Sequence, residues 1–384
     1  MTMELALWFA CAASLGLALH PFIGYPLSLL WFKRKHDSGA TLESSPLTFT
    51  ICMCAYNEEN IIEQKARNLL ALKAREPGLE VLIYVDAASD STAEKLQAFS
   101  KDFDVHVGAE RRGKTHGMNL LASRARGSVL VFTDANVMLD MECIQNLRRA
   151  FADAEIGCVC GNLIYTNGDA SITASTGSLY WRLEERIKLL EQRTGSVMGA
   201  DGSLFAIRGE LHRAPPDHII DDMFVSFMVL IQGYRVIQST DVRAYEQSAS
   251  SSSEEFHRKS RIACQAFNVH RLIWPHIRKL DALTVYKYVS HKLLRWLSIY
   301  FLSASMMLGL GALFAGGYVG FASVLVLLGA VLAFLGLRGT IKPLTQIMDV
   351  ITSLAGAGLG VWKSLRGESY QTWTPVASVR RAVE

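Results

Sequence analysis

The sequence predicts an α/β protein with a mixed, mostly parallel sheet, flanked by transmembrane helices at both ends of the chain. Three observations lead to this prediction. Apolar strand-like runs alternate with helical patterns through about residues 46–250, which is typical of βαβ units. Long uncharged runs occupy residues 5–32 and much of 298–362. Half of the 384 residues are hydrophobic and only 20% are charged, fewer than the roughly 25% of ordinary soluble domains.

The first apolar run, residues 5–32, is expected to form a transmembrane helix within an N-terminal segment 1–35. The run lacks Asp, Glu, Lys and Arg and is long enough to cross about 30 Å of hydrocarbon, even with a kink at Pro21. A cleaved signal peptide is the alternative, but such a peptide starts with basic residues rather than Glu4 and is shorter. The basic cluster at residues 33–36 then predicts a cytoplasmic location for the chain that follows.

The central segment, residues 46–250, is expected to fold as one cytoplasmic domain. Strands alternating with helices indicate a mostly parallel sheet with helices on its faces. The strand and helix patterns, in order, are FTICMCAYN and EENIIEQKARNLLALKA; VLIYVDA and STAEKLQAFS; DVHVG and THGMNLLASRARG; VLVFTDAN and MECIQNLRRAFAD.

The remaining chain is predicted to return to the membrane. Basic and apolar residues mixed through 254–297 indicate amphipathic helices at the membrane surface. Within the C-terminal membrane helices, 298–362, two apolar runs form a predicted in–out–in hairpin (298–316 and 318–337), followed by a tail, 363–384. A third run, roughly 344–362, contains Asp349 and several glycines. Its topology stays open between a span, an interfacial helix and a re-entrant segment.

Charge and cysteine content exclude several classes of protein. A net charge of +3 and an isoelectric point near 8.4 argue against a dedicated nucleic-acid binder, which would concentrate basic residues on one face. Composition also excludes a disordered chain and a disulfide-stapled secreted scaffold. The seven cysteines are expected to be small buried residues in a reducing compartment, at positions 11, 52, 54, 143, 158, 160 and 264.

One motif points toward a different chemistry. Residues 108–115, GAERRGKT, match the phosphate-binding pattern G-x-x-x-x-G-K-[ST] of P-loop nucleotide hydrolases. Two strand–helix units precede this loop, whereas a P-loop normally follows an early strand of its sheet. A nucleoside triphosphatase is therefore kept as an alternative function, and loss of hydrolysis in Lys114→Ala would support it.

Polar clusters follow the ends of the predicted strands. In an open α/β sheet, ligands bind outside the carboxyl ends of the strands. Taken singly, each cluster is compatible with helix capping; together they predict a binding site. The clusters are Ala55–Glu59, Asp86–Asp90, Asp134–Asn136, Asp221–Asp222 and the basic Arg258–Arg261.

With these clusters in this order, the chain resembles the membrane-anchored family-2 glycosyltransferases, which carry the nucleotide-sugar-binding GT-A fold and are related to polysaccharide synthases. The resemblance runs from about residue 48 to 297, and weakly on to Trp373. The stretches that carry it are AYNEEN (55–60), VDAASDST (85–92), RGKTHGMN (112–119), VLVFTDAN (129–136), GADGSLFAIR (199–208), IIDDMFVSFMVLIQGYRV (219–236), AYEQ (244–247), EFHRKSRI (255–262) and SHKLLRWL (290–297).

The resemblance implies roles for individual residues. Asp222 matches the catalytic carboxylate, a general base on the acceptor hydroxyl, and Asp221 would raise its pKa by repulsion if both face the cleft. Asp201 and Asp221 are candidates for acceptor contact. Asp86 is implied as a ribose contact or a base. The full set implied to bind nucleotide and donor is Ala55, Tyr56, Glu58, Asp86, Lys114, Asp134, Arg258 and Arg261.

Two positions depart from the family pattern. Asp134 opens the metal motif and would bind Mg²⁺ or Mn²⁺, but its usual second Asp is Asn136 here, a poorer ligand. Arg258 and Arg261 match the basic positions of the family's Q/R-x-x-R-W motif. Their alternative role is to face anionic lipid headgroups from the surface of a helix. Ile262 replaces the tryptophan of that motif, which argues against processive synthesis. Because of Asn136 and Ile262, a membrane scaffold that keeps the fold but lacks catalytic activity stays an alternative function.

The function implied by the resemblance is sugar transfer with inversion. The donor would be a nucleotide-diphosphate sugar, a UDP-sugar in the family, and the acceptor a lipid-linked or growing saccharide. The product would be a cell-surface polysaccharide or glycolipid. Implied partners are the nucleotide sugar, the acceptor, the membrane and other polysaccharide-export components, with no nucleic acid. The implied location is a bacterial-type inner (plasma) membrane, with the catalytic domain in the cytoplasm.

Overall fold

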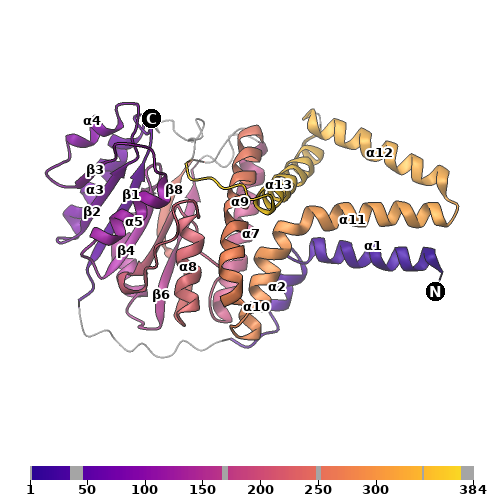
Figure 1. Cartoon of the computed structure of the whole chain (residues 1–384), viewed down its shortest axis with the longest axis horizontal. Coiled ribbons are helices and arrows are strands. Elements are labelled where there is room, and N and C mark those ends of the chain that lie inside the picture. Colours follow the sequence, from indigo (N-terminus) through magenta and orange to yellow (C-terminus); the bar gives the residue numbers. More distant parts are fainter. Residues whose placement is uncertain (1, 35–45, 167–171, 248–251, 340, 373–384) are drawn as a thin grey trace.

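The computed structural model describes residues 2–34, 46–166, 172–247, 252–339 and 341–372. Its described residues build a layered α/β domain from which apolar helices project to one side (Figure 1). Trp373, where the family resemblance ends, and Lys35, part of the predicted basic flank, lie outside these ranges. The strands are β1 (Phe49–Ala55), β2 (Glu80–Val85), β3 (Asp104–Val107), β4 (Val129–Asp134), β5 (Met138–Leu139), β6 (Ile156–Tyr165), β7 (Leu204–Arg208) and β8 (Arg235–Glu246).

The described strands form one eight-stranded sheet in the order β3-β2-β1-β4-β7-β6-β8-β5. Neighbours among β1 to β4 pair in parallel, as do β6 and β8, whereas β7 is antiparallel to both β4 and β6. The prediction of a mixed, mostly parallel sheet is therefore confirmed. Because β7 runs against both of its neighbours, β4 and β6 point the same way. The carboxyl ends of β1, β2, β4, β6 and β8 thus share one edge of the sheet.

Helices cover both faces of the sheet, which explains why β1 is buried along its whole length. The soluble-domain helices are α3 (Ile62–Arg75), α4 (Thr92–Gln97), α5 (Lys114–Arg124), α6 (Cys143–Ala150), α7 (Ile172–Arg193), α8 (Asp221–Ile231) and α9 (Ser252–Ile277), with a 3₁₀ turn, η1 (Gly209–Leu211).

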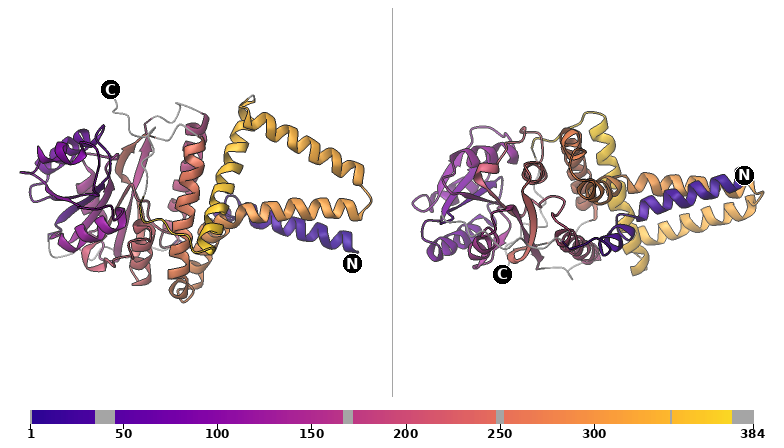
Figure 2. Two further views of the ribbon diagram at one scale, coloured as in Figure 1. Left: turned by 45° about the horizontal axis from the view of Figure 1, so that its top comes forward. Right: turned by 90° about the horizontal axis from the view of Figure 1, so that it is seen from below.

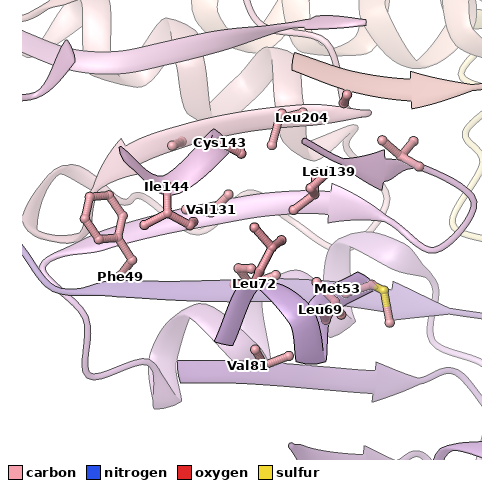
Figure 3. Packing of buried hydrophobic residues seen from close by; sticks show 14 of the residues in the cluster. Phe49, Met53, Leu69, Leu72, Val81, Val131, Leu139, Cys143, Ile144 and Leu204 are labelled. Atoms are coloured by element: carbon pink, nitrogen blue, oxygen red, sulfur yellow. The ribbon is translucent and has the colours of Figure 1, made fainter. Parts of the chain in front are cut away.

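One apolar core lies between the sheet and α3 and α6. Helix α3 buries Ile62, Ala66, Leu69 and Leu72, a helical spacing that directs one face of the helix onto the strands. Leu69 and Leu72 lie close to Val81 and Val131 in this core (Figure 3). Leu69 is fully buried, so truncating it to alanine would cost about 2–5 kcal/mol through lost burial and a cavity.

The opposite face of the sheet packs against α5, α8 and α9 in a second core. Met118 and Leu121 of α5 contribute to this core together with Phe227 of α8 and Val269 of α9. Cys143 belongs to the first core, and Cys52, Cys54, Cys158 and Cys160 belong to the second. All seven cysteines are free thiols, and all but the half-buried Cys11 are buried, as predicted.

The apolar helices form a second part of the molecule. They are α1 (Met3–Leu19), α2 (Gly24–Leu29), α10 (Ala282–Tyr288), a π-helical turn, η2 (Val289–Leu293), α11 (Leu294–Ala315), α12 (Val319–Leu337) and α13 (Lys342–Leu365). Among the described residues, Ala282–Ala315, Val319–Leu337 and Lys342–Leu365 are long and apolar enough to cross a membrane. Exposed side chains such as Met306 and Leu327 suit contact with lipid.

The N-terminal run forms two helices where the sequence predicted one span over 5–32. Helix α1 ends at Leu19 and α2 begins at Gly24, because Pro21 removes a backbone donor and interrupts the helix. Helix α1 lies antiparallel along α11, away from the sheet (Figure 2). The Ser14 hydroxyl donates to the Phe301 carbonyl at 2.8 Å, one of the polar contacts that join apolar helices.

Helix α13 lies across the bases of α11 and α12 and alongside α9 (Figure 2). Glycines allow this close approach: a Cβ at Gly360 would collide with the Ser260 carbonyl of α9, and one at Gly358 with Ile299 of α11. Arg271 of α9 donates to the Ser364 carbonyl at 2.8 Å. The last helix is therefore fixed to the helix that carries the predicted basic cluster.

Candidate functional site

The loops after β1 and β2 hold each other at the shared edge of the sheet. Asn57 adopts a left-handed backbone (φ 51°), and its side-chain oxygen accepts from the Ser89 N–H at 2.9 Å. The Glu58 N–H donates to the Thr92 hydroxyl at 2.7 Å. Ala55 is fully buried at the end of β1, and its carbonyl accepts from the Asp86 N–H at 2.9 Å. The first two predicted clusters therefore form one structural unit.

Asp86 is fully buried and binds the backbone of the loop before α5. Its carboxylate accepts from the N–H of Arg112 at 2.8 Å and of Gly113 at 3.0 Å. Gly113 has a φ of +92°, which favours glycine. These amides are used within the protein, whereas a P-loop leaves its amides free for phosphate. The geometry therefore weighs against the triphosphatase alternative.

Arg111 adds a cationic surface beside this loop. Its guanidinium carbon lies 3.6 Å from the centre of the Tyr56 ring, a cation–π contact. Its Nε lies 3.9 Å from an Asp86 oxygen. The sequence did not single out Arg111, although it directly precedes the RGKT stretch that drew attention.

Lys114, the first residue of α5, faces the acidic side of the site. Its Nζ donates to Asp134 at 2.6 Å. Burial by itself lowers the pKa of this amine, but Asp134, Asp221 and Asp222 outweigh it and hold the pKa well above its usual value. Lys114 therefore stays cationic and neutralises part of the acidic cluster.

Asp222 lies beside Lys114 at the start of α8, and Gly202 provides the room for both. A Cβ at Gly202 would lie 2.9 Å from an Asp222 oxygen and 3.1 Å from Lys114 Nζ. Burial and the neighbouring Asp221 raise the pKa of Asp222 to about 7, against the opposing effect of Lys114. The predicted like-charge effect of Asp221 is present. The Thr115 hydroxyl, bonded to the Ile219 carbonyl at 2.7 Å, fixes the start of α8 to α5.

Glu246, at the end of β8, joins the predicted metal motif. The Asn136 side-chain amide donates to Glu246 at 2.8 Å. Burial and Asp134 raise the pKa of Glu246 to about 7, while Arg258 opposes the shift. The sequence quoted Glu246 only within AYEQ, because a lone acid in a strand carries no local signal. Within the described ranges, no three His, Cys, Asp or Glu side chains are grouped as metal ligands.

Asp201 is bound from α7. Lys188, almost fully buried, donates to the Asp201 carboxylate and lies 3.6 Å from Glu185. The sequence did not single out either α7 residue. Since Asp201 precedes Gly202 directly, α7 fixes the loop that passes the Asp222 carboxylate.

The two arginines of α9 approach the same acidic cluster. Burial and the adjacent Arg258 lower the pKa of Arg261, while Asp134 and Asp222 oppose this shift. The Arg261 guanidinium donates to Gln265 on the next turn at 3.2 Å. The structure thus brings both predicted arginines to the side of the site that carries Asp134, Asp222 and Glu246.

The chain after α13 also reaches the site, which the sequence did not predict. Residues 367–372, here called the C-terminal segment, run from α13 past α9 toward the sheet (Figure 1). The Gln265 amide donates to the Tyr370 carbonyl at 3.0 Å, and the Gln371 amide donates to the Arg112 carbonyl at 3.1 Å. A Cβ at Gly113 would collide with the Gln371 carbonyl. The C-terminal segment therefore packs on the loop that Asp86 holds.

Comparisons with known proteins show similarity over the central part of the chain. Residues 50–214 match the family described as Glycosyl transferase family 2. The poly-β-1,6-N-acetyl-D-glucosamine synthase of Staphylococcus aureus (strain MSSA476) is 28% identical over 197 residues, covering 49% of this chain and 47% of that protein. The uncharacterized glycosyltransferase YfnE of Bacillus subtilis (strain 168) is 28% identical over 116 residues, 29% of each chain. This chain spans about half the length, or less, of these curated relatives.

A solved structure is similar over nearly the whole chain. The mannosyltransferase PcManGT from Pyrobaculum calidifontis, in complex with GDP-Man and Mn²⁺, aligns with a TM-score of 0.67. The alignment covers 95% of this chain and 100% of that one at 21% identity. This similarity extends beyond the sheet to the apolar helices and establishes the fold.

Proposed function

This chain is a family-2 glycosyltransferase with a GT-A-like fold, related to polysaccharide synthases, and we propose that Asp222 is the general base of its transfer reaction. The observation that carries the proposal is the convergence of Asp222 and Lys114 on Gly202. A carboxylate with a pKa of about 7 is well matched to accepting a proton near neutral pH. The retained Asp222 favours catalysis over the scaffold alternative.

In the proposed reaction, the acceptor hydroxyl attacks the anomeric carbon while the bond to the nucleotide diphosphate breaks. The hydroxyl proton passes to Asp222, and a single in-line displacement inverts the anomeric configuration. Lys114, Arg258 and Arg261 stabilise the negative charge of the departing diphosphate. Asp86 is assigned to shaping the nucleotide loop through the amides of Arg112 and Gly113, which leaves Asp222 as the base.

A divalent cation fits the oxygen-rich side of the site. Asp134 already binds the ammonium of Lys114, and Asn136 uses its nitrogen toward Glu246, so its carbonyl oxygen is the atom available to a metal. Oxygen ligands of this kind suit Mg²⁺ or Mn²⁺. A bound cation would supply charge neutralisation at the diphosphate. Asp134, Asn136 and Glu246 are the residues proposed to hold it.

The substrates are proposed at the level of chemical class. The donor is a nucleotide-diphosphate sugar, for which we propose a UDP-sugar, and Tyr56, Glu58 and Arg111 line the nucleotide side. The acceptor is a lipid-linked or growing saccharide of a cell-surface polysaccharide or glycolipid. The matching Staphylococcus aureus relative is named for a polysaccharide product, which supports a saccharide acceptor. Polysaccharide-export components are the proposed protein partners.

Membrane placement follows from the arrangement of the apolar helices. Helices α11 and α12 are proposed to cross a bacterial-type inner membrane, with the soluble domain on the cytoplasmic side. Helix α13 lies crosswise to them (Figure 2) and is proposed to lie at the interface. This arrangement would bring an acceptor emerging from the bilayer close to α7, α9 and the catalytic carboxylate.

The first test uses a panel of donors. The full-length protein in lipid nanodiscs would be given UDP-glucose, UDP-GlcNAc, UDP-galactose and GDP-mannose in turn with Mg²⁺ or Mn²⁺, and diphosphate release and donor binding would be measured. We expect binding and turnover of a UDP-sugar. Inversion predicts a β-linked product from an α-linked donor, visible by NMR. Preference for GDP-mannose would overturn the UDP assignment, and an α-linked product would overturn the single displacement.

A further inference from the structure

A groove lies between the end of β6 and helix α7, apart from the residues assigned above. Its volume is about 380 Å³, within the range of roughly 300–1,000 Å³ typical of ligand sites. The last residues of strand β6 form one wall of the groove. One face of the second half of helix α7 forms the other wall. The lining residues that matter for the argument are Asn162, Tyr165, Arg182, Glu185, Arg186 and Leu189.

The groove lies at the functional edge of the sheet. Strand β6 points the same way as β4, so Tyr165 ends at the edge where Asp134 ends. Tyr165 also pairs in register with Glu246 of β8. Ligands of open α/β sheets bind outside this edge, so the groove extends the site already described.

A short chain of contacts connects the groove to the catalytic carboxylate. Glu185 lines the groove and lies 3.6 Å from Lys188, which in turn donates to Asp201. Asp201 precedes Gly202, the residue that faces Asp222. The wall of the groove is therefore connected through Lys188 and Asp201 to the loop that faces Asp222.

The lining suits sugars better than a phosphate group. Arg182 and Arg186 are exposed and lie one helical turn apart, where their N–H groups can donate to hydroxyl oxygens. Glu185 belongs to the inner wall of the groove: its Oε2 accepts from the Gln238 amide at 2.8 Å, and its Oε1 is buried 3.6 Å from the Lys188 ammonium. The Tyr165 ring and Leu189 offer apolar surface for the C–H faces of a sugar. An isolated anion would leave that surface unused.

We propose that this groove is an acceptor subsite that binds sugar residues preceding the one that receives the new linkage. The inference rests on the proposed glycosyltransfer and extends it to acceptor recognition. Arg182 and Arg186 bind hydroxyls, and the contacts from Glu185 through Lys188 to Asp201 connect the wall of the groove to the loop beside Asp222.

The test measures saccharide binding separately from donor chemistry. Fluorescently labelled full-length protein in lipid nanodiscs would be applied to an array of neutral and phosphorylated oligosaccharides, one to four sugars long. We expect binding to oligosaccharides over monosaccharides, and at least a tenfold loss in the double variant Arg182→Ala/Arg186→Ala. Arg193→Ala, an exposed arginine of the same helix outside the groove, is the matched control and should bind like the wild type.

The possible outcomes are distinct. Unchanged binding in the double variant, or a wild type that binds no oligosaccharide, would overturn the subsite. Binding of phosphorylated sugars alone, with competition by inorganic phosphate, would overturn it in favour of an anion site. UDP-sugar binding by calorimetry should be the same in all variants. If the protein binds no donor, the proposed function is contradicted. The oligosaccharide array then tests the groove independently of that function.

Discussion

The buried carboxylate of Asp86 accepts a hydrogen bond from the Gly113 N–H at 3.0 Å and so ties the end of β2 to the start of α5. The bond fixes the loop from which Lys114 reaches Asp134. A second contact holds the same loop from outside, since the Gln371 amide donates to the Arg112 carbonyl. The proposed nucleotide side of the site is therefore shaped by one buried acid and by the C-terminal segment.

Replacing Asp86 by asparagine should weaken nucleotide binding. Asparagine keeps the size but removes the charge and one of the two acceptor oxygens, so one loop N–H loses a buried partner, at a cost of about 1–3 kcal/mol. We expect the Kd for UDP to rise by roughly tenfold or more, measured by calorimetry. Asp104→Asn, the same change at an exposed strand residue, should leave the Kd unaltered. An unchanged Kd in Asp86→Asn would contradict the assigned role.

Adding one methyl group at Gly202 should impair catalysis more than stability. Its Cβ would lie 2.9 Å from an Asp222 oxygen and 3.1 Å from Lys114 Nζ, so the two side chains must separate. We expect kcat for diphosphate release to fall by about tenfold or more, with a near-native Tm. Gly329→Ala, where a Cβ meets nothing within 4 Å, provides the control. Equal losses in both variants would argue against a specific effect on the base.

The rate should depend on the charge of Asp222. Burial and Asp221 raise the pKa of this carboxyl to about 7, and only the ionised form can accept a proton. The value of kcat/KM should therefore increase about tenfold per pH unit below pH 7 and level off above it. A flat profile between pH 5.5 and 8 would contradict a titrating base.

The raised pKa of Asp222 should also affect the stability of the fold. Because the folded-state pKa lies above the unfolded value of about 3.9, this residue favours folding at low pH and the contribution is lost as the pH rises through about 7. Asp222→Asn should therefore raise the Tm at pH 8 relative to the wild type and have little effect at pH 4, which thermal unfolding would reveal.

The C-terminal segment should support donor binding. Gln371→Ala removes the hydrogen bond to Arg112 and loosens the loop, so we expect a rise of several-fold in the KM for the donor with little change in kcat. Gln97→Ala, at an exposed helix position, should have no effect. A change confined to kcat would mean that the segment acts on the chemical step instead.

Much of the candidate site could be predicted from the sequence because clusters of polar residues follow the ends of the predicted strands. Parallel strands finish at one edge, so the polar clusters after β1, β2 and β4 had to lie together. Glu246, Lys188 and Gln371 could not be found this way. Each is a single polar residue in a strand, a helix or a tail, and its position near Asp134, Asp201 or Arg112 depends on long-range packing.

The arrangement of the apolar helices also depends on long-range packing and could not be predicted from the sequence. The sequence predicted one span over residues 5–32 that tolerates a kink at Pro21, but it does not predict the direction in which the chain continues into α2. Composition likewise left the third C-terminal run undecided. Its orientation follows from glycines that admit α9 and α11 at close range, as at Gly358 and Gly360, a contact visible only in three dimensions.

The most direct test of the account is single-turnover sugar transfer by Asp222→Asn in nanodiscs, with the donor identified from the panel. The variant keeps the shape of the side chain and removes the base. We expect donor Kd within about twofold of the wild type and a transfer rate lower by roughly 10²–10⁴-fold, whereas Asp241→Asn, at an exposed strand position, transfers normally. Transfer by Asp222→Asn at a rate near that of the wild type would contradict the assignment of Asp222 as the catalytic base.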